Sequence, residues 1–169
     1  MSLSQTRRSQ TGLTPEFRVI ETLGWLAHTC EHTGGQTGAQ RQDRHLARMA
    51  GTCAALGIAF PYAQLTALVD GLTSDHDLRL RLTVDRDGLG ALEHWPLAKT
   101  ADHWTVAIAD QRVDSADKWL AHKTTNRALY DDARGRLPVG IDEWIFLNER
   151  DEVCEGTITN VFVPDGDRL

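Results

Sequence analysis

The regular alternation of apolar and polar positions is clearest between Leu78 and Asp85, where every second residue is apolar. This pattern predicts a β-strand with one buried face. A turn signal follows at 86–88, so residues 89–97 are the predicted return strand. Residues 17–23 and 104–109 also favour extended structure, which indicates a sheet in the first two thirds of the chain.

Helical spacing of apolar residues predicts two helices between these strands. In residues 43–57 the apolar positions recur every three or four residues, with Asp43 as the expected N-cap and Gly57 as the stop. Residues 62–72 form a second amphipathic stretch, with Pro61 at its first turn.

The last third of the chain predicts one more helix and further strands. The helix should begin at Thr124 or Thr125 and run to about Arg136. Extended segments are expected at residues 144–147 and 153–154, with a further extended piece at 157–163. Strands in runs on both sides of helices indicate the α+β class.

The chain has 169 residues, enough for one domain or two small lobes. We expect a mobile leader at residues 1–15, an N-terminal lobe at 16–112 and a C-terminal lobe at 113–169. The boundary follows the polar stretch 110–115, which joins the two parts.

Composition and charge exclude several classes of function. The net charge of −6 argues against a nucleic-acid or membrane-surface partner, and no apolar run reaches membrane-spanning length. The three cysteines are widely spaced without a C-x-x-C pair, so reduced, mostly buried thiols in a cytoplasmic protein are expected. His28 and His32 are expected to be solvated, and no metal site is expected.

Lys123 is the first candidate for chemistry. A lysine just ahead of a helix and at the edge of an apolar core has its ammonium form disfavoured, which lowers the pKa of the amine. A neutral amine is what Schiff-base formation requires. The alternative is a surface lysine whose stem lies on Trp119 or Leu120.

Three motifs together resemble the class IV family of pyridoxal-phosphate-dependent aminotransferases: His45–Arg48, Lys123–Arg127 and Asn148–Phe162. This family includes branched-chain and D-amino-acid aminotransferases and 4-amino-4-deoxychorismate lyase. The resemblance implies a fold-type IV enzyme, with two small α/β lobes, pyridoxal 5'-phosphate between them and a homodimeric assembly.

The resemblance also implies roles for individual residues. Lys123 would carry the cofactor as a Schiff base and move a proton at the substrate Cα, and Glu155 would face the pyridine nitrogen. Arg48 would bind the phosphate. Glu21 and Thr22 are candidate substrate contacts, with a plain exposed pair as the alternative. The remaining expected cofactor contacts follow Glu155 in the chain: Thr157, Ile158, Thr159 and Asn160.

The expected reaction is transfer of an amino group from an amino acid to a 2-oxo acid. One alternative is 4-amino-4-deoxychorismate lyase activity, in which pyruvate is eliminated to give 4-aminobenzoate; another is a non-catalytic binding or dimerisation protein. The sequence stops at Leu169, ahead of the segment with which the family usually continues. Exposed apolar surface is expected where that segment packs.

Overall fold

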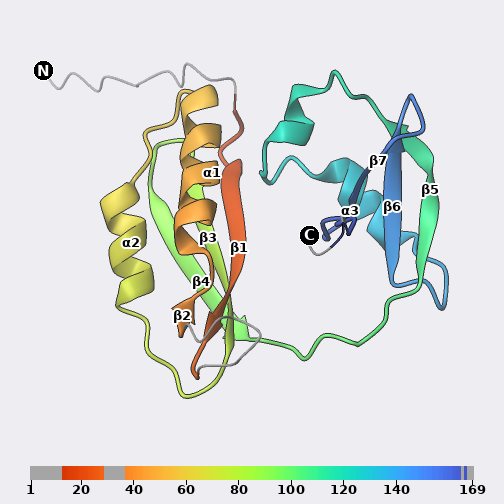
Figure 1. Cartoon of the computed structure of the whole chain (residues 1–169). Helices are drawn as coiled ribbons and strands as arrows, with labels where there is room; N and C mark the ends of the chain where they lie inside the picture. Colours follow the sequence, from red (N-terminus) through yellow and green to blue (C-terminus); the bar gives the residue numbers. More distant parts are fainter. Residues whose placement is uncertain (1–12, 29–36, 165, 167–169) are drawn as a thin grey trace, which may run out of the picture. The chain divides into compact units, whose positions relative to one another are not determined.

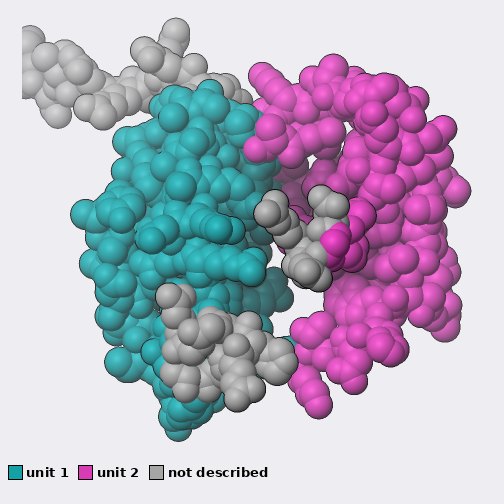
Figure 2. All heavy atoms as spheres, viewed as in Figure 1, with its two compact units in different colours: residues 1–98, 122–125 teal, residues 99–121, 126–169 magenta. Residues whose placement is uncertain are grey.

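The computed structural model describes residues 13–28, 37–164 and 166, which form two compact units, each with its own sheet and helical segments (Figure 1). Unit 1 comprises residues 1–98 and 122–125, and unit 2 comprises residues 99–121 and 126–169 (Figure 2). The expected α+β class is confirmed. The expected boundary at residues 112 and 113 falls inside unit 2, because the strand before it pairs with later strands of that unit.

Unit 1 contains an antiparallel sheet in the order β2-β1-β3-β4. Its central strands are β1 (Arg18–Leu26) and β3 (Leu78–Asp85), flanked by β2 (Gly38–Ala39) and β4 (Gly90–Pro96). The alternation that predicted β3 holds, since its four apolar side chains are all at most 2% exposed. The turn to β4 uses Gly88 at φ +82°, where a Cβ would lie 2.8 Å from the Ala59 carbonyl oxygen.

Two helices, α1 (Gln42–Ala55) and α2 (Tyr62–Asp70), cover one face of this sheet (Figure 1). Both were predicted within two residues at each end. The expected N-cap was wrong: Arg41 caps α1 at φ +54° without a side-chain bond, and Asp43 lies in the first turn, where its charge suits the helix dipole. The core beneath the helices is built from Leu46, Met49, Cys53, Leu65 and Val69.

The segment that contains Lys123 belongs to unit 1 and extends its sheet along β1. The Ile20 N–H donates to the Lys123 carbonyl oxygen at 2.9 Å, and the Thr125 N–H donates to Arg18 at 2.9 Å. Thr124 forms an antiparallel bridge with Val19. The expected helix start at Thr124 or Thr125 is therefore wrong, because these residues satisfy their backbone groups on a strand.

Unit 2 contains a three-stranded sheet in the order β5-β6-β7. Strand β5 (Val106–Val113) is parallel to β6 (Glu143–Asn148), and β7 (Val153–Gly156) is antiparallel to β6. Between β5 and β6 lie a 3-10 turn (Lys118–Ala121) and α3 (Ala128–Gly135).

The core of unit 2 lies between α3 and the sheet. It contains Ala109, Val113, Ala133 and Phe146, with Tyr130 and Trp144 among the partly buried side chains packed against it. The extended piece expected at residues 157–163 is not a strand. Its apolar side chains are exposed, Phe162 by 64% and Val163 by 76%. The exposed apolar surface expected where a further family segment packs stays a prediction.

Three smaller expectations also have outcomes. Within the expected leader, residues 1–12 lie outside the described residues, whereas Leu13 accepts a hydrogen bond from Arg86 at 3.3 Å. Cys53 is buried as expected, but Cys154 is exposed because it lies on the edge strand β7. Cys30 and His32 lie outside the described residues. Among the described residues, no helix is long and apolar enough to span a membrane.

Candidate functional site

The best-defined polar cluster of unit 1 is the Glu21 cluster, formed by Glu21, His45 and Arg48. Glu21 lies on β1 and is 0% exposed, facing α1. Arg48 donates to both of its carboxylate oxygens, from Nε at 2.5 Å and from Nη2 at 2.7 Å, and His45 Nδ1 lies 2.8 Å from Oε2. His45 and Arg48 can both reach Glu21 because residues three apart share a helix face.

This environment keeps Glu21 ionised. Burial alone would raise the pKa of Glu21, but the hydrogen bonds from Arg48 and His45 and the positive charges of Arg48 and Lys123 together lower it. The bond to Glu21 in turn raises the pKa of Arg48. Arg48 and Lys123 both lie where positive charge acts on this carboxylate, which suits the binding of an anion nearby. The Arg48 side chain remains 48% exposed.

Both carboxylate oxygens of Glu21 are bound by residues of α1, Arg48 and His45. The expected contact between Glu21 and a substrate stays a prediction. Thr22 points to the opposite sheet face, where it lies directly across from Arg81 on β3. The buried Nε of Arg81 has no hydrogen-bond partner among the described residues. Sequence reasoning missed Arg81, although it occupies a polar position in the alternating strand.

In unit 2, Glu155 on β7 is held by a residue from α3. The Tyr130 hydroxyl donates to Glu155 Oε1 at 2.6 Å. The Tyr130 ring packs edge-on against Phe146, with centroids 5.5 Å apart, and the Arg127 guanidinium lies 5.1 Å from its centroid. Burial, followed by the bond to Glu155 and its negative charge, raises the pKa of Tyr130, so this hydroxyl stays protonated and donates. Sequence reasoning missed the bond between Tyr130 and Glu155.

The residues after Glu155 form a turn around another carboxylate, Glu143 at the start of β6. Its side chain is 1% exposed. The N–H groups of Thr157 and Ile158 each donate to it at 3.1 Å, as does the Thr159 hydroxyl at 3.1 Å, and the Thr157 hydroxyl makes a further short bond. These are the donors that were expected to grip a phosphate. Asn160, the last residue of that expected set, is exposed.

The expected site residues thus form two groups, each described within its own unit. Arg48, Lys123 and Thr22 belong to unit 1, and Glu155 and the 156–159 turn belong to unit 2. The pairing of Lys123 with Glu155 around one cofactor stays a prediction.

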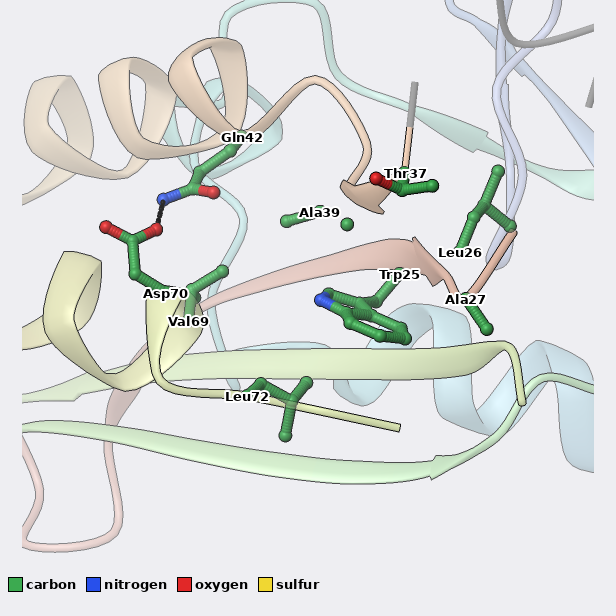
Figure 3. A pocket seen from close by; sticks show the side chains of 10 residues that line it. Trp25, Leu26, Ala27, Thr37, Ala39, Gln42, Val69, Asp70 and Leu72 are labelled. Atoms are coloured by element: carbon green, nitrogen blue, oxygen red, sulfur yellow. Dashed lines mark hydrogen bonds between the residues drawn. The ribbon is translucent and has the colours of Figure 1, made fainter. Parts of the chain in front are cut away.

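A separate pocket of unit 1 contains none of these residues. It has a volume of about 410 Å³ and lies between the end of β1, β2 and α2 (Figure 3). Trp25, Val69 and Leu72 supply apolar walls, and Gln42 donates to Asp70 at 3.4 Å at its rim.

The chain is an α+β protein of two units. In unit 1 the backbone of Lys123 pairs with β1, which carries Glu21 of the Glu21 cluster. Together with the motif residues, this arrangement indicates a cofactor-binding enzyme. The sequence profile of the amino-transferase class IV family matches residues 29–169. The chain belongs to the class IV aminotransferase family.

Solved structures agree with this assignment. The chain is 38% identical to a provisionally named amino-acid aminotransferase from Mesorhizobium loti, with a TM-score of 0.73, covering 90% of this chain and 72% of that one. For a provisionally named branched-chain amino acid aminotransferase from Thermotoga maritima, the identity is 20%, the TM-score 0.65 and the coverage 83% and 50%.

A third structure, 4-amino-4-deoxychorismate lyase from Pseudomonas aeruginosa, is 23% identical with a TM-score of 0.61, and the coverage is 83% of this chain and 56% of that one. At these identities the last two likenesses concern the fold alone, and the chain spans only about half of their length. Comparison with curated proteins found no match.

Proposed function

We propose that this chain acts as a pyridoxal-phosphate-dependent aminotransferase that moves an amino group from an amino acid to a 2-oxo acid. One observation carries the proposal: Lys123 is held by backbone pairing beside β1, where its charge helps to lower the pKa of Glu21, the carboxylate that fixes Arg48. A lysine for the cofactor aldehyde and an arginine for its phosphate therefore belong to one unit.

The residues present fit the cofactor chemically. The Arg48 guanidinium suits a dianionic phosphate, because this partly exposed side chain can bind phosphate oxygens while Glu21 holds its other side. His45 also contacts the Glu21 carboxylate and helps to hold it in place. Because Glu21 in turn orients the Arg48 guanidinium before the anion binds, binding does not incur the entropy cost of ordering it.

Lys123 is proposed as the catalytic residue. Its amine would bind the cofactor aldehyde and, once a substrate amine displaces it, take a proton from the substrate Cα and return one during the transfer. The cofactor, when bound, supplies an electron sink for the resulting negative charge. The pairing of residues 123–125 with β1 fixes the backbone from which this amine reaches.

Glu155 is proposed to face the pyridine nitrogen and keep it protonated. The hydrogen bond from Tyr130 to Oε1 supports this role, because it orients the carboxylate. The second carboxylate oxygen, Oε2, would then be the one that faces the pyridine nitrogen. Thr157, Ile158 and Thr159 give their described donors to Glu143, so they would shape the wall next to Glu155 rather than bind phosphate with those groups. Asn160, which is exposed beside this turn, remains a proposed contact.

The substrate is proposed to lie against the sheet face that carries Thr22 and Arg81. The buried Nε of Arg81, which has no described partner, would donate to a substrate carboxylate, and the Thr22 hydroxyl opposite would add a polar contact. A homodimer, expected by family analogy, belongs to the same proposal.

The test is an absorbance spectrum of the purified chain after incubation with pyridoxal phosphate and removal of the unbound cofactor, followed by borohydride reduction and peptide mapping. The chain has three lysines, Lys99, Lys118 and Lys123, so the modified position is unambiguous. We expect a band in the near-ultraviolet to visible range and a reduced adduct on Lys123. Lys123→Ala should abolish both, whereas Lys118→Ala, the matched control, should change neither.

Turnover then identifies the reaction. Consumption of an amino acid only in the presence of a 2-oxo acid supports the aminotransferase. Release of pyruvate from aminodeoxychorismate without a second substrate would assign the chain as a lyase. A protein that stays colourless with added cofactor would support the non-catalytic alternative.

A further inference from the structure

Glu143 is the most completely hydrogen-bonded carboxylate of unit 2, yet it belongs to none of the expected site residues. Its two oxygens accept from the N–H groups of Thr157 and Ile158 and the hydroxyls of Thr157 and Thr159, and the N–H group of Trp144 donates to Oε1 as well. Arg134 approaches the same carboxylate at 3.5 Å and also donates to the Thr157 hydroxyl at 3.1 Å. Consecutive N–H groups that converge in this way form an anion-binding concavity. Here the anion is part of the chain itself.

The turn is closed tightly around this carboxylate. The Gly156 N–H donates to the Thr159 carbonyl oxygen at 3.1 Å. A Cβ at Gly156 would overlap the Thr159 hydroxyl and lie 3.0 Å from Glu143 Oε2, so only glycine fits there. Although burial alone would raise the pKa of Glu143, the bonds from Thr157, Ile158 and Thr159 lower it, which keeps the carboxylate ionised as their acceptor.

The turn begins directly after Glu155, whose backbone pairs with Phe146 on the same strand that begins with Glu143. Glu143 therefore fixes the chain on the C-terminal side of Glu155, while Tyr130 holds the Glu155 side chain. Arg127 adds a third tie, because its Nη2 donates to the Thr157 carbonyl oxygen at 2.5 Å.

We infer that Glu143 is a positioning residue: its buried carboxylate acts as the internal anion that organises the 156–159 turn and thereby sets the direction of Glu155. The second half of this inference rests on the proposed function, since it is the cofactor that Glu155 would face. The first half concerns the chain alone.

The full chain tests both halves. In Glu143→Gln, an NH₂ group replaces one of the two acceptor oxygens and faces the N–H and hydroxyl donors of residues 157–159. We therefore expect amide hydrogen exchange at Thr157 and Ile158, measured by NMR, to become at least tenfold faster. Asp110→Asn removes an exposed carboxylate from β5 of the same unit and should leave both rates unchanged. Unchanged protection of the two amides in Glu143→Gln would overturn the inference.

A milder pair of variants covers the case in which Glu143→Gln does not fold. Thr159→Val removes one hydroxyl donor to Glu143, and Thr159→Ser keeps it. Exchange at Ile158 should accelerate in the valine variant and stay near the parent rate in the serine variant. Equal rates in both variants would count against Glu143 as the organiser of the turn.

The cofactor readout separates this inference from the proposed function. With pyridoxal phosphate bound, Glu143→Gln should shift the pH midpoint of the absorbance band, because the carboxylate near the pyridine nitrogen moves. A midpoint identical to that of the parent, together with faster amide exchange, would overturn the link to Glu155. If the parent chain itself binds no cofactor, the proposed function fails, whereas the exchange rates still decide whether Glu143 holds the turn.

Discussion

Among the described residues, each unit buries one glutamate, and the two glutamates are hydrogen-bonded in different ways. Glu21 of unit 1 is 0% exposed and is bound by cationic or titratable side chains, Arg48 and His45. Glu143 of unit 2 is 1% exposed and is bound mainly by neutral N–H and hydroxyl groups of one turn.

The difference teaches what each carboxylate can do. A glutamate bound by an arginine from a helix orders a cation whose remaining donors can serve a ligand, so the Glu21 cluster prepares an anion site. A glutamate bound by backbone groups uses up those donors and gives a fixed backbone shape instead. The same residue type therefore supplies electrostatics in unit 1 and geometry in unit 2.

The sharpest way to break this comparison is Glu143→Ala. The substitution leaves two backbone N–H groups and the Thr157 hydroxyl of the turn without their hydrogen-bond acceptor. We therefore expect a loss of about 3 kcal/mol in the free energy of unfolding. Urea unfolding of the variant beside Asp110→Asn measures it. A loss below about 1 kcal/mol would mean that the turn relaxes to water and does not depend on Glu143.

Glu21→Gln should have a smaller effect on stability and a larger one on ligand binding. Arg48 is half exposed and can be rehydrated, so we expect a loss of about 2 kcal/mol in the free energy of unfolding. Binding of pyridoxal phosphate, followed by absorbance titration, should weaken because Arg48 is no longer oriented. Glu93→Gln on β4 of the same unit is the control, since Glu93 is exposed. Unchanged cofactor affinity in Glu21→Gln would remove the functional side of the comparison.

Both glutamates should contribute to the decrease in the free energy of unfolding at acid pH. Their folded-state pKa values lie below the ordinary 4.5, so the unfolded chain takes up protons first as the pH falls. Their contribution is complete above about pH 5 and is lost as the pH falls through the folded-state values. We expect protonation to lower the free energy of unfolding by less than either substitution does, because a protonated carboxyl still accepts hydrogen bonds. Urea unfolding between pH 3 and 6 should give flatter profiles for Glu21→Gln and Glu143→Gln than for the parent.

The smallest expected effect belongs to Tyr130→Phe. The ring keeps its contacts with Phe146 and Arg127, and only the bond to Glu155 is lost, so we expect about 1 kcal/mol or less in the free energy of unfolding. The pH midpoint of the cofactor band should still move, because Glu155 loses its donor. Tyr62→Phe is the matched control, as Tyr62 is the other of two tyrosines and is 56% exposed. A midpoint that moves equally in both variants would contradict a role for Tyr130.

Both helices and three of the four described strands of unit 1 could be predicted because their patterns are periodic, whereas the two-residue strand β2 was not predicted. Strand β3 was predicted at its observed bounds, since alternation identifies a strand whose one face is buried. The start of α3 could not be predicted, because Thr124 and Thr125 look like helix caps locally but pair with residues of β1 more than 100 positions away. Tertiary pairing of this kind leaves no local signal.

The candidate site could be predicted at the level of residues, but not of their partners. Motifs identified Arg48, Lys123 and Glu155 as important, yet the burial of Glu21 beneath α1 and the use of the 157–159 donors by Glu143 depend on packing between distant segments. Glu143 gave no motif signal of its own. Its position directly before the strand predicted at residues 144–147 was the only clue.

The pairing of residues 122–125 with β1 makes the two units inseparable by a single cut in the chain. A fragment ending at Ala98 would contain both helices and all four strands of the first sheet, but it would leave Arg18 and Ile20 without their backbone partners. An uncovered strand edge of this kind invites pairing with other chains. The first unit is therefore expected to aggregate when expressed alone, and attempts to dissect this protein should preserve the crossing segment.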